Sequence, residues 1–251
     1  MGDDAPLEPP YDIAICFGGG DFKKAGQWIK SLCVSRLGLA PSGRVLDVGC
    51  GAGRAAIPLT DYLTTGRYEG FDVFPIGVEW ASANITPRFP NFVFRSVSVY
   101  NKTYNPFSPV KARDFRFPYP DASFDAAILN SVFTHMFPED VHGYMRELSR
   151  TLDAGGGTLI TWYLVDGLAR EMLAKKEAKP DMSHKFGSFY VENPAEPEDA
   201  VAYDQGFVER LYAQAGFDIL EILPGSWKKA PGASNHQDAV LAVKRREGAG
   251  A

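Results

Sequence analysis

The sequence of 251 residues is poor in cysteine, with Cys16, Cys33 and Cys50 as its three examples. An odd number of thiols without a C-x-x-C pair indicates neither a disulfide framework nor a zinc site. The sequence also lacks an apolar run of the roughly 18 to 20 residues that span a bilayer. Its acidic, proline-rich start, residues 1–10, lacks the basic and apolar regions of a secretory signal and is expected to have no fixed structure. We therefore expect a cytoplasmic protein with reduced thiols, no metal site and no membrane association.

Basic residues are outnumbered as well. The chain has 26 Lys and Arg against 31 Asp and Glu, which gives a formal net charge of -5 and a pI of about 5.4. Because nucleic-acid binding depends on clustered Lys and Arg, this balance argues against RNA or DNA as a partner. The content of 45% hydrophobic and 23% charged residues is ordinary for a globular chain, and the length suits one domain.

Strand and helix patterns alternate along most of the chain. Short apolar runs bounded by turn residues predict strands, and apolar residues at three- and four-residue spacing predict helices. Glycines at 38, 155–157 and 216 mark expected helix ends, and Asp204 is the expected N-cap of the last helix. The predicted strands are 44–48, 68–73, 92–99, 123–129, 158–164, 217–223 and 238–244, and the predicted helices are 23–37, 54–63, 76–84, 141–152, 168–176 and 207–215.

This alternation predicts an α/β fold with a doubly wound, seven-stranded and mostly parallel sheet. The connection 224–237 is short enough for the last two strands to pair antiparallel. Residues 164–203 interrupt the alternation with a proline-containing stretch that is too long for a simple connection, and we interpret it as a lid. The predicted parts of this single domain are an N-terminal loop and cap helix (1–39), a ligand-binding core (40–163), the lid insertion after the fifth strand (164–203) and a C-terminal helix with strands (204–244).

A glycine-rich turn follows the first predicted strand, in the string Val45-Leu-Asp-Val-Gly-Cys-Gly-Ala-Gly-Arg54. Such a turn brings backbone N–H groups and a helix N-terminus to the carboxyl end of a sheet, where a nucleoside can approach closely. Asp72 ends the second predicted strand and suits the hydroxyl groups of a ribose. Residues 51–56 also fit the dinucleotide pattern G-x-G-x-x-G/A, so the glycines alone leave NAD open. Asp47 favours a different ligand, because its carboxylate suits a bound ammonium group and repels a pyrophosphate.

With this string the chain resembles the class I S-adenosylmethionine-dependent methyltransferases, whose fold is Rossmann-like. Residues 46–54 and 70–73 are similar to the family's first two motifs, and 117–125 and 147–156 to its fourth strand and following helix-turn, so that the resemblance covers 40–163. It implies S-adenosylmethionine as the cofactor and S-adenosylhomocysteine as its product. The glycines would pack against the methionine part, Asp72 would hold the ribose, and Val73 and Phe74 would lie against adenine. The implied cofactor-binding residues are Asp47, Gly49, Cys50, Gly51, Gly53, Asp72, Val73, Phe74, Ser98, Val99 and Asn130.

One position departs from the family's pattern. The family often has an acid after its third strand to receive the adenine amino group, and the matching region, 97–100, offers Ser98 instead. Asp114 is the alternative if residues 101–120 fold back over the site. The adenine contact therefore stays open between these two.

Transfer from a sulfonium depends mainly on in-line positioning and exclusion of water, but a hydroxyl acceptor also needs a base. Asn130-Ser-Val-Phe-Thr-His135 follows the fourth predicted strand, so His135 is our candidate general base. The alternative is a structural histidine at the start of the next helix. Charged and aromatic residues in 184–190 and 227–237 are candidate acceptor contacts, and the glycines of 17–22 can form an anion nest at the cofactor's carboxylate end or serve as a plain linker.

The sequence therefore predicts a methyltransferase for a small-molecule acceptor, with O-methylation of a sugar or natural product as the leading hypothesis. N-methylation of a small molecule or peptide, an NAD-dependent oxidoreductase and a binding module without turnover are the alternatives. The oligomeric state stays open, with a homodimer as the candidate assembly.

Overall fold

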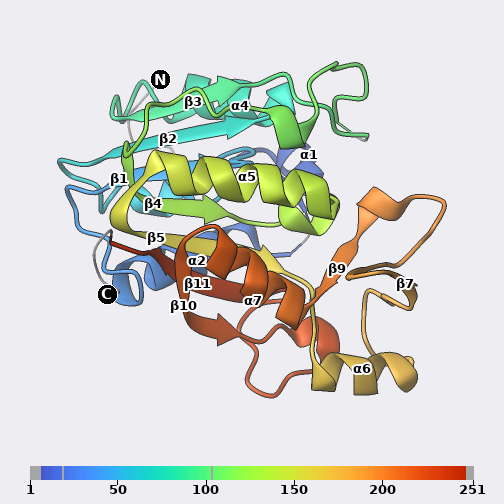
Figure 1. Ribbon diagram of the computed structural model, residues 1–251. Coiled ribbons are helices and arrows are strands. Elements are labelled where there is room, and N and C mark those ends of the chain that lie inside the picture. Colours follow the sequence, from blue (N-terminus) through green and yellow to red (C-terminus); the bar gives the residue numbers. More distant parts are fainter. Residues whose placement is uncertain (1–6, 19, 103, 247–251) are drawn as a thin grey trace.

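The computed structural model describes residues 7–18, 20–102 and 104–246, and its centre is a seven-stranded sheet (Figure 1). The strand order is β10-β11-β5-β4-β1-β2-β3. All neighbours pair in parallel except β11, which is antiparallel to both β10 and β5. This confirms the predicted fold. The strands are β1 (Arg44–Val48), β2 (Arg67–Asp72), β3 (Phe92–Ser96), β4 (Phe124–Leu129), β5 (Leu152–Trp162), β10 (Phe217–Leu223) and β11 (Asp238–Lys244).

Helices cover both faces of the sheet, which explains why its central strands are apolar along their whole length. On one face α5 (Pro138–Thr151) and α7 (Gln205–Gln214) close one hydrophobic core, and Figure 1 shows them in front of the strands. On the other face α2 (Phe22–Ser35), α3 (Ala56–Leu59) and α4 (Pro75–Asn84) close a second. Of the helices in the described ranges, none is both long and apolar enough to cross a membrane.

The order of the strands places a crevice beside β1. After β1 the chain moves outward to β2 and β3, and it then returns to the other side of β1 as β4. The connections on the two sides therefore diverge above the carboxyl ends of β1 and β4. In doubly wound sheets this switch point is where ligands bind.

The insertion after β5 is a folded unit with a small sheet of its own, in the order β6-β9-β8-β7. Its buried side chains form a separate core with Trp227 from the C-terminal part. In Figure 1 it lies beside one end of the main sheet. Its elements are β6 (Leu164–Val165), α6 (Gly167–Ala174), β7 (His184–Phe186), β8 (Phe189–Val191), the 3-10 helix η4 (Pro197–Asp199) and β9 (Val201–Asp204).

Three local predictions were wrong. The helix predicted over 54–63 is only the four residues of α3, because the glycine turn extends to Ala55. The glycines at 155–157 do not end α5; that helix runs directly into β5, and these residues form an irregularity in the pairing with β4, where Gly155 has a φ of +85°. Asp204 occupies the predicted N-cap position of α7, but its side chain does not cap the helix, since the carboxylate accepts hydrogen bonds from Tyr190, Arg170 and Lys185 instead.

The start of the described chain is also more ordered than predicted. Leu7 packs against the second core and Pro9 is buried, so residues 7–10 have a fixed place. Residues 1–6, which share that prediction, lie outside the described residues. Two short elements follow, α1 (Tyr11–Ala14) and the 3-10 helix η1 (Ile15–Phe17).

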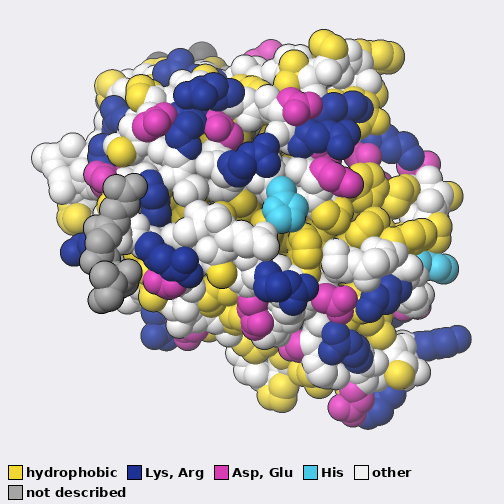
Figure 2. All heavy atoms as spheres, viewed as in Figure 1, with side chains coloured by type: hydrophobic (Ala, Val, Ile, Leu, Met, Phe, Trp, Pro, Cys, Tyr) yellow, Lys and Arg dark blue, Asp and Glu magenta, His cyan; other side chains and the backbone are white. Residues whose placement is uncertain are grey.

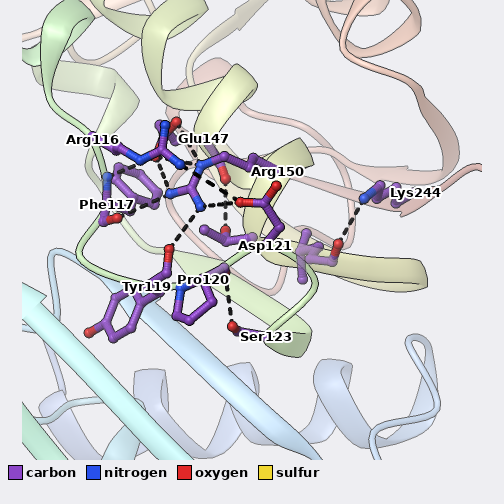
Figure 3. Close-up of polar contacts among 11 residues, drawn as sticks. Arg116, Phe117, Tyr119, Pro120, Asp121, Ser123, Glu147, Arg150 and Lys244 are labelled. Carbon is purple, nitrogen blue, oxygen red and sulfur yellow. Dashed lines mark hydrogen bonds and ion pairs between the residues drawn. The ribbon is translucent and has the colours of Figure 1, made fainter.

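Arg150 ties the last turn of α5 to the segment that leads into β4 (Figure 3). Its guanidinium donates to the Glu147 carboxylate at 2.5 Å, to the Asp121 carboxylate at 2.8 Å, and to the carbonyls of Tyr119 at 2.8 Å and Phe117 at 3.1 Å. Burial acts to raise the pKa of Glu147, but the bonds from Arg150 and the Phe117 N–H outweigh it and lower the pKa. This cluster gives a structural reason for the motifs at 117–125 and 147–156.

We expect Arg150→Met to lower the free energy of unfolding by about 2 to 3 kcal/mol, because it removes the cation paired with the Glu147 carboxylate and the side-chain donor to the carbonyls of Tyr119 and Phe117. Urea denaturation at neutral pH measures this. Arg116→Met is the matched control, since the Arg116 side chain is 73% exposed and its contact with Asp121 is long, at 3.9 Å; a change of at most about 0.5 kcal/mol is expected. Equal effects of the two substitutions would contradict the role of Arg150.

Candidate functional site

A cavity of about 290 Å³ opens at the carboxyl ends of β1, β2 and β4, at the switch point beside β1. It brings together residues that lie far apart in the sequence. The sequence-predicted residues on its wall are Asp47, Gly49, Cys50, Gly51, Asp72, Val73, Phe74, Val99, Asn130 and His135.

Two predicted cofactor residues lie off this wall. Gly53 has a φ of +83° and faces inward, because a Cβ there would lie 2.7 Å from Cδ1 of Ile85. The Ser98 hydroxyl donates to Ser108 at 3.2 Å and so points to a neighbouring loop. The alternative for the adenine contact, Asp114, is exposed and is not part of the described wall either. Neither candidate side chain reaches the cavity in this structure.

Asp47 supplies a buried carboxylate to the cavity. It is 3% exposed and accepts a hydrogen bond from the Tyr68 hydroxyl. Burial raises its pKa to about 7; the Tyr68 bond acts to lower it and the charge of Asp72 to raise it. Because burial makes this carboxylate costly to ionise, a cationic ligand stabilises its charge by more free energy than it would the charge of an exposed carboxylate.

Asp72 joins the end of β2 to the glycine turn. Its two oxygens accept the Gly51 N–H at 2.8 Å and the Phe74 N–H at 2.9 Å. Burial raises its pKa although these N–H groups act to lower it. Each carboxylate oxygen has a second lone pair, so Asp72 can still accept hydrogen bonds from the ribose hydroxyls, as predicted.

The glycine turn forms a close-fitting floor. Gly49 and Gly51 have φ values of +76° and +51°, which glycine adopts without strain. A Cβ on Gly49 would lie 2.6 Å from Cγ2 of Val132, so a side chain there has no space. The Cys50 thiol between them is buried, and burial raises its pKa well above the usual value. It therefore stays protonated and packs in the interior.

Aromatic rings form the wall beyond Asp72. The ring of Phe74 lies 5.0 Å from that of Tyr104 and 5.7 Å from that of Phe17, measured between centroids. Val73 and the buried Val99 complete this end of the cavity. Two carboxylates, a glycine floor and an apolar wall thus fit the ammonium, ribose and adenine parts of the S-adenosylmethionine that the sequence predicted.

His135 also lines the cavity, from the 3-10 helix η3 (Phe133–His135). Its Nδ1 is 3.0 Å from the carbonyl oxygen of Glu198 in the insertion. Because a carbonyl oxygen only accepts, Nδ1 carries the proton, and the neutral ring keeps Nε2 as its acceptor. The insertion therefore fixes the tautomer that a general base requires.

Two carboxylates that the sequence did not indicate lie on the cavity wall with His135. Asp140, in the first turn of α5, and Glu198 both line the cavity, together with Tyr144, Phe137 and Met136. Oδ1 of Asp140 accepts the Arg113 N–H at 2.9 Å, and burial raises its pKa. Glu198 arrives from 63 positions beyond His135, so no local pattern pointed to it.

The acceptor contacts proposed at 184–190 and 227–237 are not part of the described wall. The Lys228 side chain is buried and forms ion pairs of 2.8 Å with both Asp166 and Asp238. The Trp227 indole donates to Asp238 at 2.7 Å. These polar groups satisfy one another, and their role is to join the insertion to β11.

Charges of both signs are interspersed over the face shown in Figure 2, without a broad basic field on that face. The described wall of the cavity carries four acidic residues, Asp47, Asp72, Asp140 and Glu198, against Arg54 and His135. The cavity is therefore acidic.

A family model described as a methyltransferase domain matches residues 26–222. The chain is 26% identical over 187 residues to the tRNA N(3)-cytidine methyltransferase METTL2 of Gallus gallus, a match that covers 74% of this chain and 46% of that protein. It is 34% identical over 119 residues to the fatty-acid O-methyltransferase of Mycolicibacterium smegmatis, covering 47% of this chain and 36% of that protein. These matches span less than half of either relative.

Among solved structures, the chain is similar in fold to the 1,6-didemethyltoxoflavin-N1-methyltransferase of Burkholderia thailandensis, solved with 1,6-didemethyltoxoflavin and S-adenosylhomocysteine. The TM-score is 0.59 at 18% identity, over 89% of this chain and 80% of that one.

Proposed function

Since the chain belongs to the methyltransferase domain family and is a class I S-adenosylmethionine-dependent enzyme, we propose that it methylates a hydroxyl group of a small molecule, such as a sugar or natural product. The cofactor, when bound, supplies an electrophilic methyl group whose sulfur leaves without acid catalysis. Asp47 holds its ammonium group, Asp72 its ribose, and Val73 and Phe74 line the adenine position. The family also favours this cofactor over the dinucleotide that the glycine pattern left open.

The observation that carries the O-methyl proposal is the contact between His135 Nδ1 and the Glu198 carbonyl at 3.0 Å. It leaves Nε2 of the neutral ring to take the proton of an acceptor hydroxyl as the new C–O bond forms. Glu198 belongs to the insertion, so this contact supports a role for the insertion as a lid over the part of the cavity that would hold the acceptor.

The acidic cavity supports an acceptor without negative charge. The names of the two curated relatives point to a fatty acid and a tRNA as acceptors, and both are anions. Near His135 the described wall offers Asp140 and Glu198 and no Lys or Arg, because Arg54 lies at the glycine turn. An anionic acceptor would be repelled there, whereas a neutral or cationic one would not.

The same two carboxylates favour a second candidate, N-methylation of an amine. Asp140 and Glu198 can hold a substrate's ammonium group, and His135 Nε2 can take the proton that this group must lose before its nitrogen attacks the methyl group. Mass spectrometry of the methylated product separates the two candidates, because it identifies the atom that carries the new methyl group.

We expect release of S-adenosylhomocysteine in a panel of small acceptors to depend on acceptor charge. Neutral polyols and phenols, or amines, should support turnover, and the corresponding carboxylic acids should react at least about tenfold more slowly. Turnover restricted to fatty acids or to tRNA would contradict the proposal.

A further inference from the structure

The segment from Pro10 to Gly18 forms a strap beside the cavity, and the chain is fastened before this strap and again where α2 begins. Before it, Leu7 packs against the core and Pro9 is buried. After it, the Asp21 carboxylate caps α2 by accepting the Lys24 N–H at 2.9 Å. Between these ends, α1 and η1 contain no buried residue. The attachment of the strap therefore depends on few contacts.

The principal contact is the ring of Phe17, which enters a niche formed by two glycines. A Cβ on Gly51 would lie 2.6 Å from Cδ1 of this ring, and one on Gly77 would lie 2.3 Å from its Cζ. Glycine inside a helix costs about 1 kcal/mol of stability relative to alanine. The close contact with Phe17 explains why a glycine stands at position 77 of α4 in spite of this cost. Both glycines leave room for Phe17, and Phe17 lines the cavity.

Hydrogen bonds to backbone carbonyls hold the strap in place around this ring. The Arg54 guanidinium donates to the Phe17 carbonyl at 2.9 Å and to the Gly18 carbonyl at 3.1 Å. The Tyr104 hydroxyl donates to the Cys16 carbonyl at 3.4 Å. Beyond the ring, Gly18 and Gly20 have φ values of +95° and +92°, a backbone that bends without side-chain strain.

We propose that this strap is a gate for the cofactor and that Phe17 is its retaining side chain. With the ring in its niche, Phe17 lies over Gly51, where the methionine part is expected, and the cofactor leaves only after the ring lifts out. One half-buried ring and a few exposed or half-buried hydrogen bonds hold the strap, so releasing it costs much less free energy than unfolding the whole protein. The strap therefore opens by itself while the sheet stays intact. The inference rests on the family's cofactor and is independent of His135 and of the acceptor.

Phe17→Ala is expected to speed dissociation of S-adenosylhomocysteine about tenfold, the equivalent of about 1.4 kcal/mol. Stopped-flow displacement of the bound product measures this rate without any acceptor. Ile15→Ala is the matched control, because this side chain is in the same strap, is 50% exposed and does not line the cavity. Its rate should stay within twofold of the wild type. A Phe17→Ala rate within twofold of wild type, or equal acceleration by Ile15→Ala, would overturn the gate.

Hydrogen exchange on the wild-type protein tests the same gate without a substitution. S-adenosylhomocysteine should slow exchange of the amides in 11–18 at least about tenfold, because bound product holds the strap closed. Unchanged exchange in the bound protein would overturn the gate alone. Failure of the wild type to bind the product at all would overturn the cofactor assignment and the gate together.

Discussion

Replacing His135 with alanine is expected to lower methyl transfer by about 10² or more, the usual contribution of a general base, while affinity for S-adenosylhomocysteine stays within about twofold. The effect should fall on kcat, because the proposed cofactor contacts come from Asp47, Asp72 and the glycine turn and not from His135. Steady-state kinetics with the best acceptor of the panel, together with calorimetry of the product, measure the two quantities.

A second substitution separates the base from the tautomer-fixing contact. In His135→Asn the amide nitrogen can donate to the Glu198 carbonyl in place of Nδ1, but no basic nitrogen remains. Turnover should therefore be as low as in His135→Ala, and recovery in the asparagine variant would assign His135 a structural role. His142→Ala is the matched control, since His142 packs edge-on against Phe207, 5.7 Å away, outside the described wall.

The parts of this molecule that the sequence predicted are those set by local patterns. The strand before the glycine turn is an apolar run ended by glycines, and β1 has the predicted bounds. Asp47 and Asp72 follow from strand ends that must meet at one edge of a parallel sheet. The seven strands and the antiparallel position of β11 follow from the alternation and from one short connection.

What the sequence did not predict depends on contacts between distant segments. The strands of the insertion are two to four residues long, too short for a periodic signal, and they pair across many positions. Glu198 reaches the cavity from a segment without a ligand-binding pattern, and Phe17 lines it in a segment where the sequence indicated only the glycines as a possible cofactor contact. One signal was present in the sequence: Gly77 within a predicted helix indicates a close approach, and the structure shows Phe17 and the Gly51 backbone there.

Asp47→Asn is expected to weaken binding of S-adenosylhomocysteine by about 10² or more at pH 7.5, because it removes a buried carboxylate from an ammonium group. The pKa of Asp47 is raised to about 7 by burial, so the empty pocket ionises it only above that pH. In the wild type the dissociation constant should rise about tenfold per pH unit below pH 7 and level off above it. Calorimetry between pH 5.5 and 7.5 measures the dissociation constant. Its dependence on pH should be present in the wild type and in the control Asp140→Asn, and absent in Asp47→Asn.

The same substitution should change the stability of the free protein in the opposite direction. A carboxyl group whose pKa is raised on folding favours the folded state while it is protonated, and this contribution is lost as the pH rises from about 4 to about 7. At pH 8 the free wild type therefore holds an unfavourable buried charge, and Asp47→Asn, which keeps an acceptor for the Tyr68 hydroxyl, should raise the melting temperature. Weaker binding together with a higher melting temperature would show that the Asp47 carboxylate binds the ligand and destabilises the ligand-free protein. A variant that binds weakly because it is less stable than the wild type would contradict this role.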